Sequence, residues 1–379
     1  MADEFDIVVI GGGPAGYATA LYAGAAGLSV GLIEKDKVGG TCLHRGCIPA
    51  KEFLETANVA RTVRSAGDYG IDTGAMSVTF SKSARRKEQV VGQLHAGLQG
   101  LLKKRKVVTY AGIGSLGSDR VVTVRAEDGT TTSLTGKWIV LAAGSVPRTI
   151  PGFDIDGRFI LTSDEVLSLE KLPASAVVIG GGAIGCEFAS MMADLGTQVT
   201  ILEALPGILP GCDKEVADVV SRAFTKKGIQ VRTGVQVHGH TPKGGVRTVV
   251  SFGDGEEVTV EAVVVSVGRR PLSEGLLGPD SGIELSAQGF VKVDEWMGTN
   301  VPGVFALGDL VDSPQLAHVG FAEAILAVKT MLGEQASPID YGKVPWCIYC
   351  NPEVAFAGLS EQAAVSAGYS VVTHKTRFS

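Results

Sequence analysis

Two cysteines at positions 42 and 47 are the residues of this sequence best suited to redox chemistry. In a regular helix, Cα atoms at that separation lie roughly 8–9 Å apart, whereas a disulfide needs less than about 7 Å. The pair can therefore form a disulfide only if the turn between Cys42 and Cys47 is irregular. Three nearby glycines would permit this, namely Gly39, Gly40 and Gly46. Pro49 fits the first turn of a helix that follows.

The surroundings of the two cysteines favour a reactive thiol. A cysteine at a helix start, close to basic side chains such as His44 and Arg45, is expected to have a lowered thiol pKa. The alternative is a pair of buried structural cysteines. Six cysteines in 379 residues do not make a disulfide scaffold.

A glycine motif that binds dinucleotides occurs twice in the chain. Each copy has a β-branched run, a G-x-G-x-x-G turn, a helical stretch, a second apolar run and an acidic residue. The motif glycines are Gly11, Gly13 and Gly16 in the first copy and Gly180, Gly182 and Gly185 in the second. In such a motif the first glycine makes the turn, the second lets a pyrophosphate approach, and the third packs helix on strand. Two glycine-rich turns without a ligand are the alternative.

The acid that closes each copy indicates how a ribose would be held. Glu34 and Glu203 each follow their motif at a separation of about 20 residues, where a carboxylate accepts hydrogen bonds from a ribose diol. Two sites in one chain imply two different dinucleotides, a flavin and a nicotinamide. Ala204 and Leu205 follow Glu203, and no arginine stands there to receive a 2′-phosphate. The second site is therefore expected to prefer NAD over NADP.

Composition excludes several classes of protein. Hydrophobic residues make up 45% of the chain and charged residues 20%, which excludes a wholly disordered polypeptide. A net charge of −6 argues against a nucleic-acid or anionic-membrane partner. The uncharged stretch from Ile7 to Ile33 is long enough to span a bilayer. However, it contains many glycines, and the residues that precede it are acidic. We expect neither nucleic acid nor membrane as partner, and a cytoplasmic location.

The motifs together resemble the pyridine nucleotide–disulfide oxidoreductases. The stretch GGTCLHRGCIPAK at 39–51, the GGGAIGCEFA motif that begins at Gly180, and TNVPGVFALGD ending at Asp309 are most similar to the dihydrolipoyl dehydrogenases. The resemblance covers essentially the whole chain. It implies flavin-dependent oxidation of protein-bound dihydrolipoamide, with FAD and NAD as cofactors, a homodimer, and a lipoyl domain of a 2-oxoacid dehydrogenase complex or a related lipoyl protein as partner.

The resemblance also implies roles for single residues. Cys42 would be the interchange thiol and Cys47 the thiolate in charge transfer with the flavin, while Lys51 would lie near flavin N5 and pair with Glu187. Asp309 would bind the ribityl chain of the flavin. Three further positions are expected to contact the cofactors: Gly144 in the strand and turn that close the FAD domain, Ala317 beside the pyrimidine edge of the flavin, and Gly268 where the chain returns from the NAD domain.

The expected fold class is α/β, with two Rossmann-like dinucleotide-binding domains and the start of an α+β interface (dimerisation) domain. Residues 1–146 and 272–344 would form the FAD domain, with an inserted helical stretch over roughly 48–103. Residues 147–271 would form the NAD domain, and 345–379 part of the interface domain. Proline and glycine at 147–152 and 268–271 mark the two crossings.

One element of the family's chemistry is not found in this sequence. The family's general base is a histidine followed by proline, and none of the six histidines here has proline after it. The resemblance therefore implies a chain truncated at its C-terminus, which binds FAD and NAD but oxidises dihydrolipoamide poorly, because loss of a general base costs about 10²–10⁴-fold in rate. Two alternatives stay open: a disulfide reductase of the glutathione, mercuric or CoA-disulfide type, and a diaphorase-like nucleotide-binding protein without dithiol chemistry.

Overall fold

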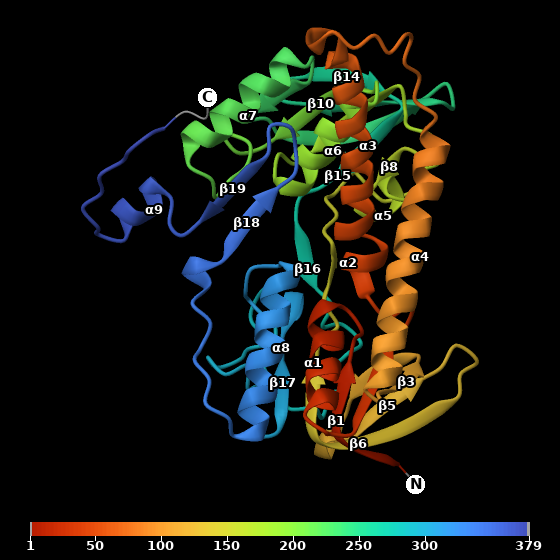
Figure 1. The fold of residues 1–379 in the computed structure, drawn as a ribbon, viewed down its shortest axis with the longest axis vertical. Coiled ribbons are helices and arrows are strands. Elements are labelled where there is room, and N and C mark those ends of the chain that lie inside the picture. The colour runs from red at the N-terminus through yellow and green to blue at the C-terminus, as the bar shows by residue number, and fades with distance from the viewer. Residues whose placement is uncertain (1, 377–379) are drawn as a thin grey trace. The chain divides into compact units, whose positions relative to one another are not determined.

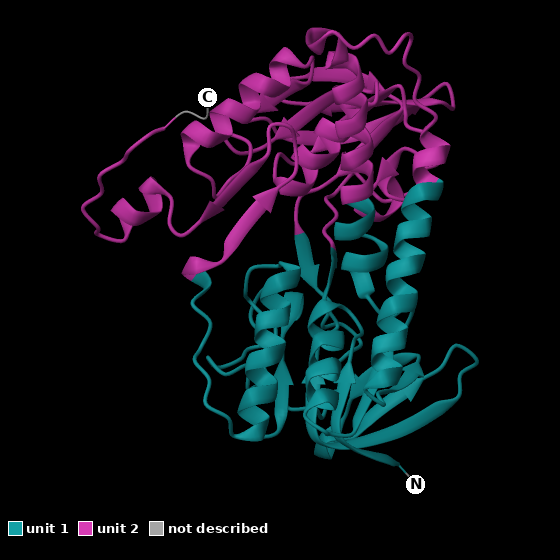
Figure 2. Ribbon diagram, viewed as in Figure 1, with its two compact units in different colours: residues 1–50, 85–146, 269–341 teal, residues 51–84, 147–268, 342–379 magenta. Residues whose placement is uncertain are grey.

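The computed structural model describes residues 2–376, which form two compact units (Figures 1 and 2). The first unit comprises residues 2–50, 85–146 and 269–341, and the second 51–84, 147–268 and 342–376. The borders at 146 and 269 lie close to the crossings expected from the sequence. The second unit also contains residues 51–84 and 342–376. The assignment of the FAD and NAD domains to these residue ranges stays a prediction.

The first unit is built on a sheet whose centre is parallel. Its strand order is β3 (Val108–Ala111), β2 (Val30–Glu34), β1 (Asp3–Ile10), β6 (Thr131–Leu141), β5 (Val122–Arg125) and β4 (Ile113–Leu116), and β17 (Val304–Ala306) pairs in parallel with the end of β6. The uncharged run from Ile7 to Ile10 is buried at the centre of this sheet, so its apolarity reflects a sheet core. Helices α1 (Pro14–Ala25) and α8 (Ala317–Leu332) pack side by side (Figure 1).

The second unit repeats this plan with a fully parallel sheet. Its strand order is β11 (Gln230–Thr233), β10 (Gln198–Glu203), β9 (Ser175–Ile179), β15 (Ala262–Val265) and β8 (Ile160–Leu161). Helix α6 (Ala183–Asp194) connects β9 to β10 as α1 connects β1 to β2. An antiparallel sheet of β12 (Val237–Lys243), β13 (Arg247–Phe252) and β14 (Glu256–Val260) accompanies it, with helices α5 (Ser163–Val166) and α7 (Lys214–Lys226).

Several shorter elements complete the described chain. The cysteine segment forms α2 (Gly40–His44) and the start of α3 (Cys47–Ser65), and α4 (Phe80–Lys104) follows, so the predicted helical stretch is two helices separated by residues 66–79. β7 (Ser145–Pro147) pairs with β16 (Arg269–Pro271). The last described segment forms the hairpin β18 (Pro345–Ile348) and β19 (Val354–Ala357), then α9 (Glu361–Ser366). No helix within residues 2–376 is long and apolar enough to cross a membrane.

Both βαβ units that the repeated motif predicts are present, one in each compact unit. In each, a buried parallel strand leads into a glycine turn, a helix and a neighbouring parallel strand. The α/β fold class with two Rossmann-like units is therefore confirmed.

Candidate functional site

The three glycines of each motif differ in what surrounds them. A Cβ atom at Gly11 would lie 2.2 Å from the carbonyl oxygen of Ala142, and one at Gly16 would lie 1.8 Å from that of Gly11. A Cβ at the middle glycine, Gly13, would meet nothing closer than Gly40 Cα at 4.0 Å. The first and third glycines are thus required by packing, while the second faces open space.

The second motif shows the same division. A Cβ at Gly180 would lie 2.4 Å from the carbonyl oxygen of Ser266, and one at Gly185 would lie 2.0 Å from that of Gly180, whereas Gly182 has no neighbour within 4 Å. Gly180, like Gly11, has a positive φ (+103° and +108°) that few other residues adopt. An open middle glycine between two tightly packed ones is the arrangement that lets a pyrophosphate approach the backbone.

The helices that follow the two glycine turns begin without a side-chain cap. Gly13 and Gly182 are the N-caps of α1 and α6, and neither helix has an acidic side chain in its first turn. The first N–H groups of a helix have no partner within the helix, and the helix dipole places positive potential there. Open space in front of an uncapped helix start fits the phosphates of a dinucleotide at both motifs.

The two motif acids make contacts that the sequence does not predict. Glu34 accepts hydrogen bonds from Gly12 N at 2.7 Å and Asp36 N at 2.9 Å. Glu203 likewise accepts bonds from Gly181 N at 2.5 Å and Leu205 N at 2.7 Å. Each carboxylate therefore ties its glycine turn to the end of the next strand. A carboxylate has about four acceptor sites, so both acids can accept further bonds from a ribose.

The cysteine segment packs against the first glycine turn. Gly39 N donates to the carbonyl oxygen of Gly12 at 2.7 Å, and a Cβ at Gly40 would lie 2.6 Å from Gly13 Cα. Helix α2, which carries Cys42, ends at His44, and its C-cap Arg45, with a φ of −140°, interrupts the helix before Cys47 begins α3. The irregular turn expected between the two cysteines is present, and both of them are partly exposed.

The basic neighbours of the cysteines are less available than expected. Burial lowers the pKa of His44, while its hydrogen bond with the Val38 carbonyl oxygen, at 2.9 Å, opposes that shift. Arg45 forms an ion pair with Asp36 at 3.0 Å. Partial burial disfavours the imidazolium of His44, and a lowered thiol pKa at the cysteines stays a prediction. The N-terminus of α3 remains as a source of positive potential at Cys47.

Tyr17 on α1 is a neighbour of the cysteines that sequence analysis missed. Burial, with additional effects from Cys42 and Cys47, raises the pKa of Tyr17 to about 12. Its ring packs edge-on against Phe321 of α8, with centroids 5.4 Å apart. Tyr17 directly follows the first glycine motif, but only the packing of the cysteine segment on that motif reveals its place.

The second unit brings together the pair expected from the family resemblance. Lys51 Nζ lies 3.1 and 3.0 Å from the two carboxylate oxygens of Glu187. Glu187 is 7% exposed and also accepts a bond from Tyr349 N at 2.9 Å. The ammonium of Lys51 lies 4.8 Å from the centre of the Tyr349 ring, within the range of a cation–π contact. Tyr349 is thus a further member of this group that the sequence does not indicate.

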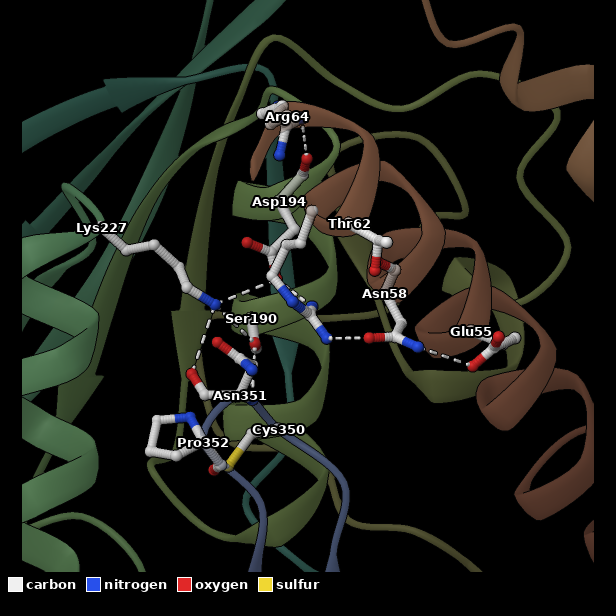
Figure 3. A network of polar contacts seen from close by, with 11 residues as sticks. Glu55, Asn58, Thr62, Arg64, Ser190, Asp194, Lys227, Cys350, Asn351 and Pro352 are labelled. Carbon is white, nitrogen blue, oxygen red and sulfur yellow. Dashed lines mark hydrogen bonds and ion pairs between the residues drawn. The ribbon is translucent and has the colours of Figure 1, made fainter. Parts of the chain in front are cut away.

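The face of α6 that carries Glu187 also carries a polar network, which holds the segment that contains Tyr349 (Figure 3). Ser190 Oγ accepts a bond from Asn351 N at 3.0 Å, as Glu187 does from Tyr349 N. Buried Asp194 binds Arg61 at 2.6 Å and Lys227 at 3.0 Å, and Lys227 also donates to the carbonyl oxygen of Asn351 at 3.3 Å. This network fixes the backbone beside Glu187.

Asp309 belongs to a separate polar group in the first unit. It follows β17 in a short 3-10 turn, Gly308–Leu310, and accepts a bond from Ser145 Oγ at 2.5 Å. Arg269 binds the same hydroxyl at 2.7 Å and lies 3.9 Å from the Asp309 carboxylate. Both partners orient the carboxylate and leave it 30% exposed.

The remaining predicted positions lie at turns and helix ends. Gly144 has a φ of +75° and its carbonyl accepts a bond from Leu272 N at 2.9 Å. Ala317 begins α8, whose N-cap Leu316 makes no side-chain cap. Gly268 has a φ of +103°, and its carbonyl accepts a bond from Arg148 N at 3.0 Å. Their contacts with cofactors stay predictions.

The fold is shared with a well-defined group of proteins. The family described as pyridine nucleotide-disulphide oxidoreductase matches residues 5–324. The chain belongs to this family, and it is an oxidoreductase. The family uses FAD and NAD, which confirms the two cofactors expected from the repeated glycine motif.

The chain is also similar to individual proteins of known name over most of their length. A dihydrolipoyl dehydrogenase of Bacillus subtilis is 40% identical over 100% of this chain and 82% of its own length. One from Chlorobaculum parvum is 37% identical over 99% of this chain and 80% of its own length. Among solved structures, LpdA of Mycobacterium tuberculosis has a TM-score of 0.89 at 28% identity, covering 97% of this chain and 80% of that one. The HOCl-induced flavoprotein disulfide reductase RclA of Escherichia coli gives 0.86 at 26% identity, with the same coverage.

Proposed function

We propose that this chain oxidises protein-bound dihydrolipoamide, passing the electrons through the Cys42–Cys47 pair and FAD to NAD. The observation that carries the proposal is the packing of Gly40 on Gly13, which places the cysteine segment directly on the first glycine turn. A dithiol-reactive pair next to a dinucleotide site supports electron transfer between the two. The similarity to relatives named dihydrolipoyl dehydrogenase supports the choice of substrate.

The cysteines carry out the exchange with the substrate. In the oxidised enzyme a disulfide joins Cys42 and Cys47. A thiolate of the substrate attacks Sγ of Cys42, the bond between the cysteines breaks, and Cys47 leaves as a thiolate stabilised by the start of α3. The second substrate thiol then displaces Cys42, so that lipoamide forms, two protons are released and both enzyme sulfurs are reduced. FAD, when bound, would supply the chemistry that passes this electron pair to NAD as a hydride, which takes up one of the two protons while Cys42 and Cys47 form their disulfide again.

The remaining residues bind and orient. Gly13 and Gly182 leave space for the two pyrophosphates, while Glu34 and Glu203 accept the ribose hydroxyls of FAD and NAD respectively. Asp309, oriented by Ser145, binds the ribityl chain of the flavin. Gly144, Ala317 and Gly268 offer backbone to the cofactors at turns and at a helix start.

The ion pair with Glu187 holds the Lys51 ammonium in the position that we propose lies near flavin N5. The pair is fixed in turn by the Tyr349 backbone, which the network around Ser190 anchors. We propose in addition that the protein acts in the cytoplasm as a homodimer, on the lipoyl domain of a 2-oxoacid dehydrogenase complex or a related lipoyl protein.

Two measurements test the proposal. Anaerobic reduction of the FAD-loaded protein is expected to produce a thiolate-to-flavin charge-transfer band, and the variant Cys47→Ser is expected to lack it. NAD reduction with dihydrolipoamide is compared with the reduction of glutathione disulfide by NADPH. Turnover of the second pair alone, or a protein without any charge-transfer band, would refute the assignment.

A further inference from the structure

A fully buried carboxylate on α8 has no part in the chemistry described above. The Glu323 side chain is 0% exposed and accepts hydrogen bonds from Gly308 N at 2.6 Å and from the Tyr341 hydroxyl at 2.8 Å. Burial raises the pKa of Glu323, and its hydrogen bonds oppose that shift. An apolar residue of similar volume is often at least as favourable for stability as a buried charged group. Stability alone therefore gives little reason for a carboxylate at this position.

The partners of Glu323 indicate what it does. Gly308 precedes Asp309, and its φ of +70° sets the turn that follows β17. A Cβ at Gly308 would lie 2.9 Å from Cβ of Ala15, so the turn is also pressed against the start of α1. The other partner, Tyr341, is the last residue of the first unit. Glu323 thus joins the Asp309 turn to the point where the chain leaves that unit.

We propose that Glu323 is a positioning residue for the flavin site, which holds the Gly308 amide and thereby fixes Asp309 for contact with the ribityl chain. The inference rests on the proposed function, because it takes Asp309 as a flavin ligand. Two independent anchors then define Asp309: Ser145 orients its carboxylate, and Glu323 fixes its backbone. Removal of the acceptor would leave the partly buried Gly308 N–H without this partner and let the turn relax.

The variants separate positioning from stability. Glu323→Met keeps the side-chain volume but removes the acceptor. Glu323→Gln keeps an oxygen for Gly308 N and an amide that can donate to the Tyr341 oxygen. Leu326→Ala is the control, because it opens a cavity in the same helix and Leu326, 4% exposed, lies in the apolar core.

FAD affinity of the apoprotein and the thermal midpoint are measured for the full chain and each variant. We expect Glu323→Met to weaken FAD binding 10- to 100-fold, equivalent to about 1.4 to 2.8 kcal/mol at 1.4 kcal/mol per tenfold. Glu323→Gln is expected to restore binding to within about threefold of wild type, because both hydrogen bonds persist. Leu326→Ala is expected to lower the thermal midpoint and leave the FAD dissociation constant within a factor of about two.

The outcomes distinguish this inference from the function on which it rests. Wild-type affinity in Glu323→Met overturns the positioning role and leaves the proposed function intact. The positioning role is also overturned if Leu326→Ala loses as much FAD affinity as Glu323→Met and has a similar thermal midpoint. The loss of affinity would then follow from reduced stability alone. Absence of FAD binding by the wild-type chain overturns both.

Discussion

Replacement of the middle glycine of the second motif is expected to weaken NAD binding at least tenfold without destabilising the fold. Gly182 has a φ of −74° and ψ of −174°, which alanine adopts readily, and a Cβ placed there would meet no atom within 4 Å. The variant Gly182→Ala should therefore be as stable as wild type, or more stable by up to about 1 kcal/mol, because alanine restricts the unfolded chain. The added methyl group would occupy the space in which the pyrophosphate approaches the backbone.

The matched control is Gly185→Ala in the same turn. Its Cβ would lie 2.0 Å from the carbonyl oxygen of Gly180, a backbone atom that cannot move without displacing β9 from α6. Overpacking of this kind costs about 1–3 kcal/mol or more, and each kcal/mol lowers the midpoint of a domain of this size by about 2–4 °C. The two variants should thus affect different properties: Gly182→Ala weakens NAD binding alone, and Gly185→Ala lowers the stability of the fold.

The assay is a thermal melt of each variant, paired with titration of NAD by calorimetry. We expect a wild-type melting temperature and at least a tenfold weaker NAD affinity for Gly182→Ala, a loss of about 1.4 kcal/mol or more. Wild-type NAD affinity in this variant would refute the assignment of that space to the pyrophosphate. A lowered melting temperature would refute the conclusion that the middle glycine is not required by packing.

Three further predictions concern polar side chains. Asp194→Asn should cost about 3 kcal/mol in urea unfolding, because it removes the buried counter-charge of Lys227 and Arg61, whose side chains are 20% and 25% exposed. The pKa of His44 is lower in the folded chain than its unfolded value of 6.5, so the unfolded chain binds more protons in acid. The free energy of unfolding should therefore fall as the pH decreases through about 6.5. The variant His44→Gln should weaken that fall in a pH series of unfolding midpoints. Ser145→Ala should weaken FAD binding about fivefold in a fluorescence titration, because Asp309 loses a hydrogen bond worth about 1 kcal/mol.

The sequence was sufficient for those parts of the fold that repeat or follow a local rule. The period of the apolar runs and the spacing of Gly11, Gly13 and Gly16 predict the βαβ unit, because both are set by the geometry of one strand and one helix. The interruption between Cys42 and Cys47 followed from helix geometry together with the assumption that the two cysteines form a disulfide. The roles of the individual glycines, by contrast, needed the neighbouring chain, such as the Ala142 carbonyl against Gly11.

What the sequence did not predict depends on contacts between distant segments. Tyr349 and Glu187 meet because a backbone amide in the C-terminal segment binds a helix side chain, and no spacing rule connects the two positions. The lowered pKa of His44 results from burial, which the neighbouring arginine and glycine in the sequence do not indicate. The compact units place residues 51–84 with the second motif, although the chain enters and leaves them within continuous helices.

The packing of Gly40 on Gly13 limits how this centre can be engineered. Because any side chain at position 40 would push into the backbone of the first glycine turn, the cysteine segment and that turn form one inseparable piece. Transplanting the cysteine pair into another flavoprotein would succeed only if both segments were moved together. In a randomised library, position 40 should accept only glycine even though it lies outside the dinucleotide fingerprint, and a second change within the fingerprint should not rescue it.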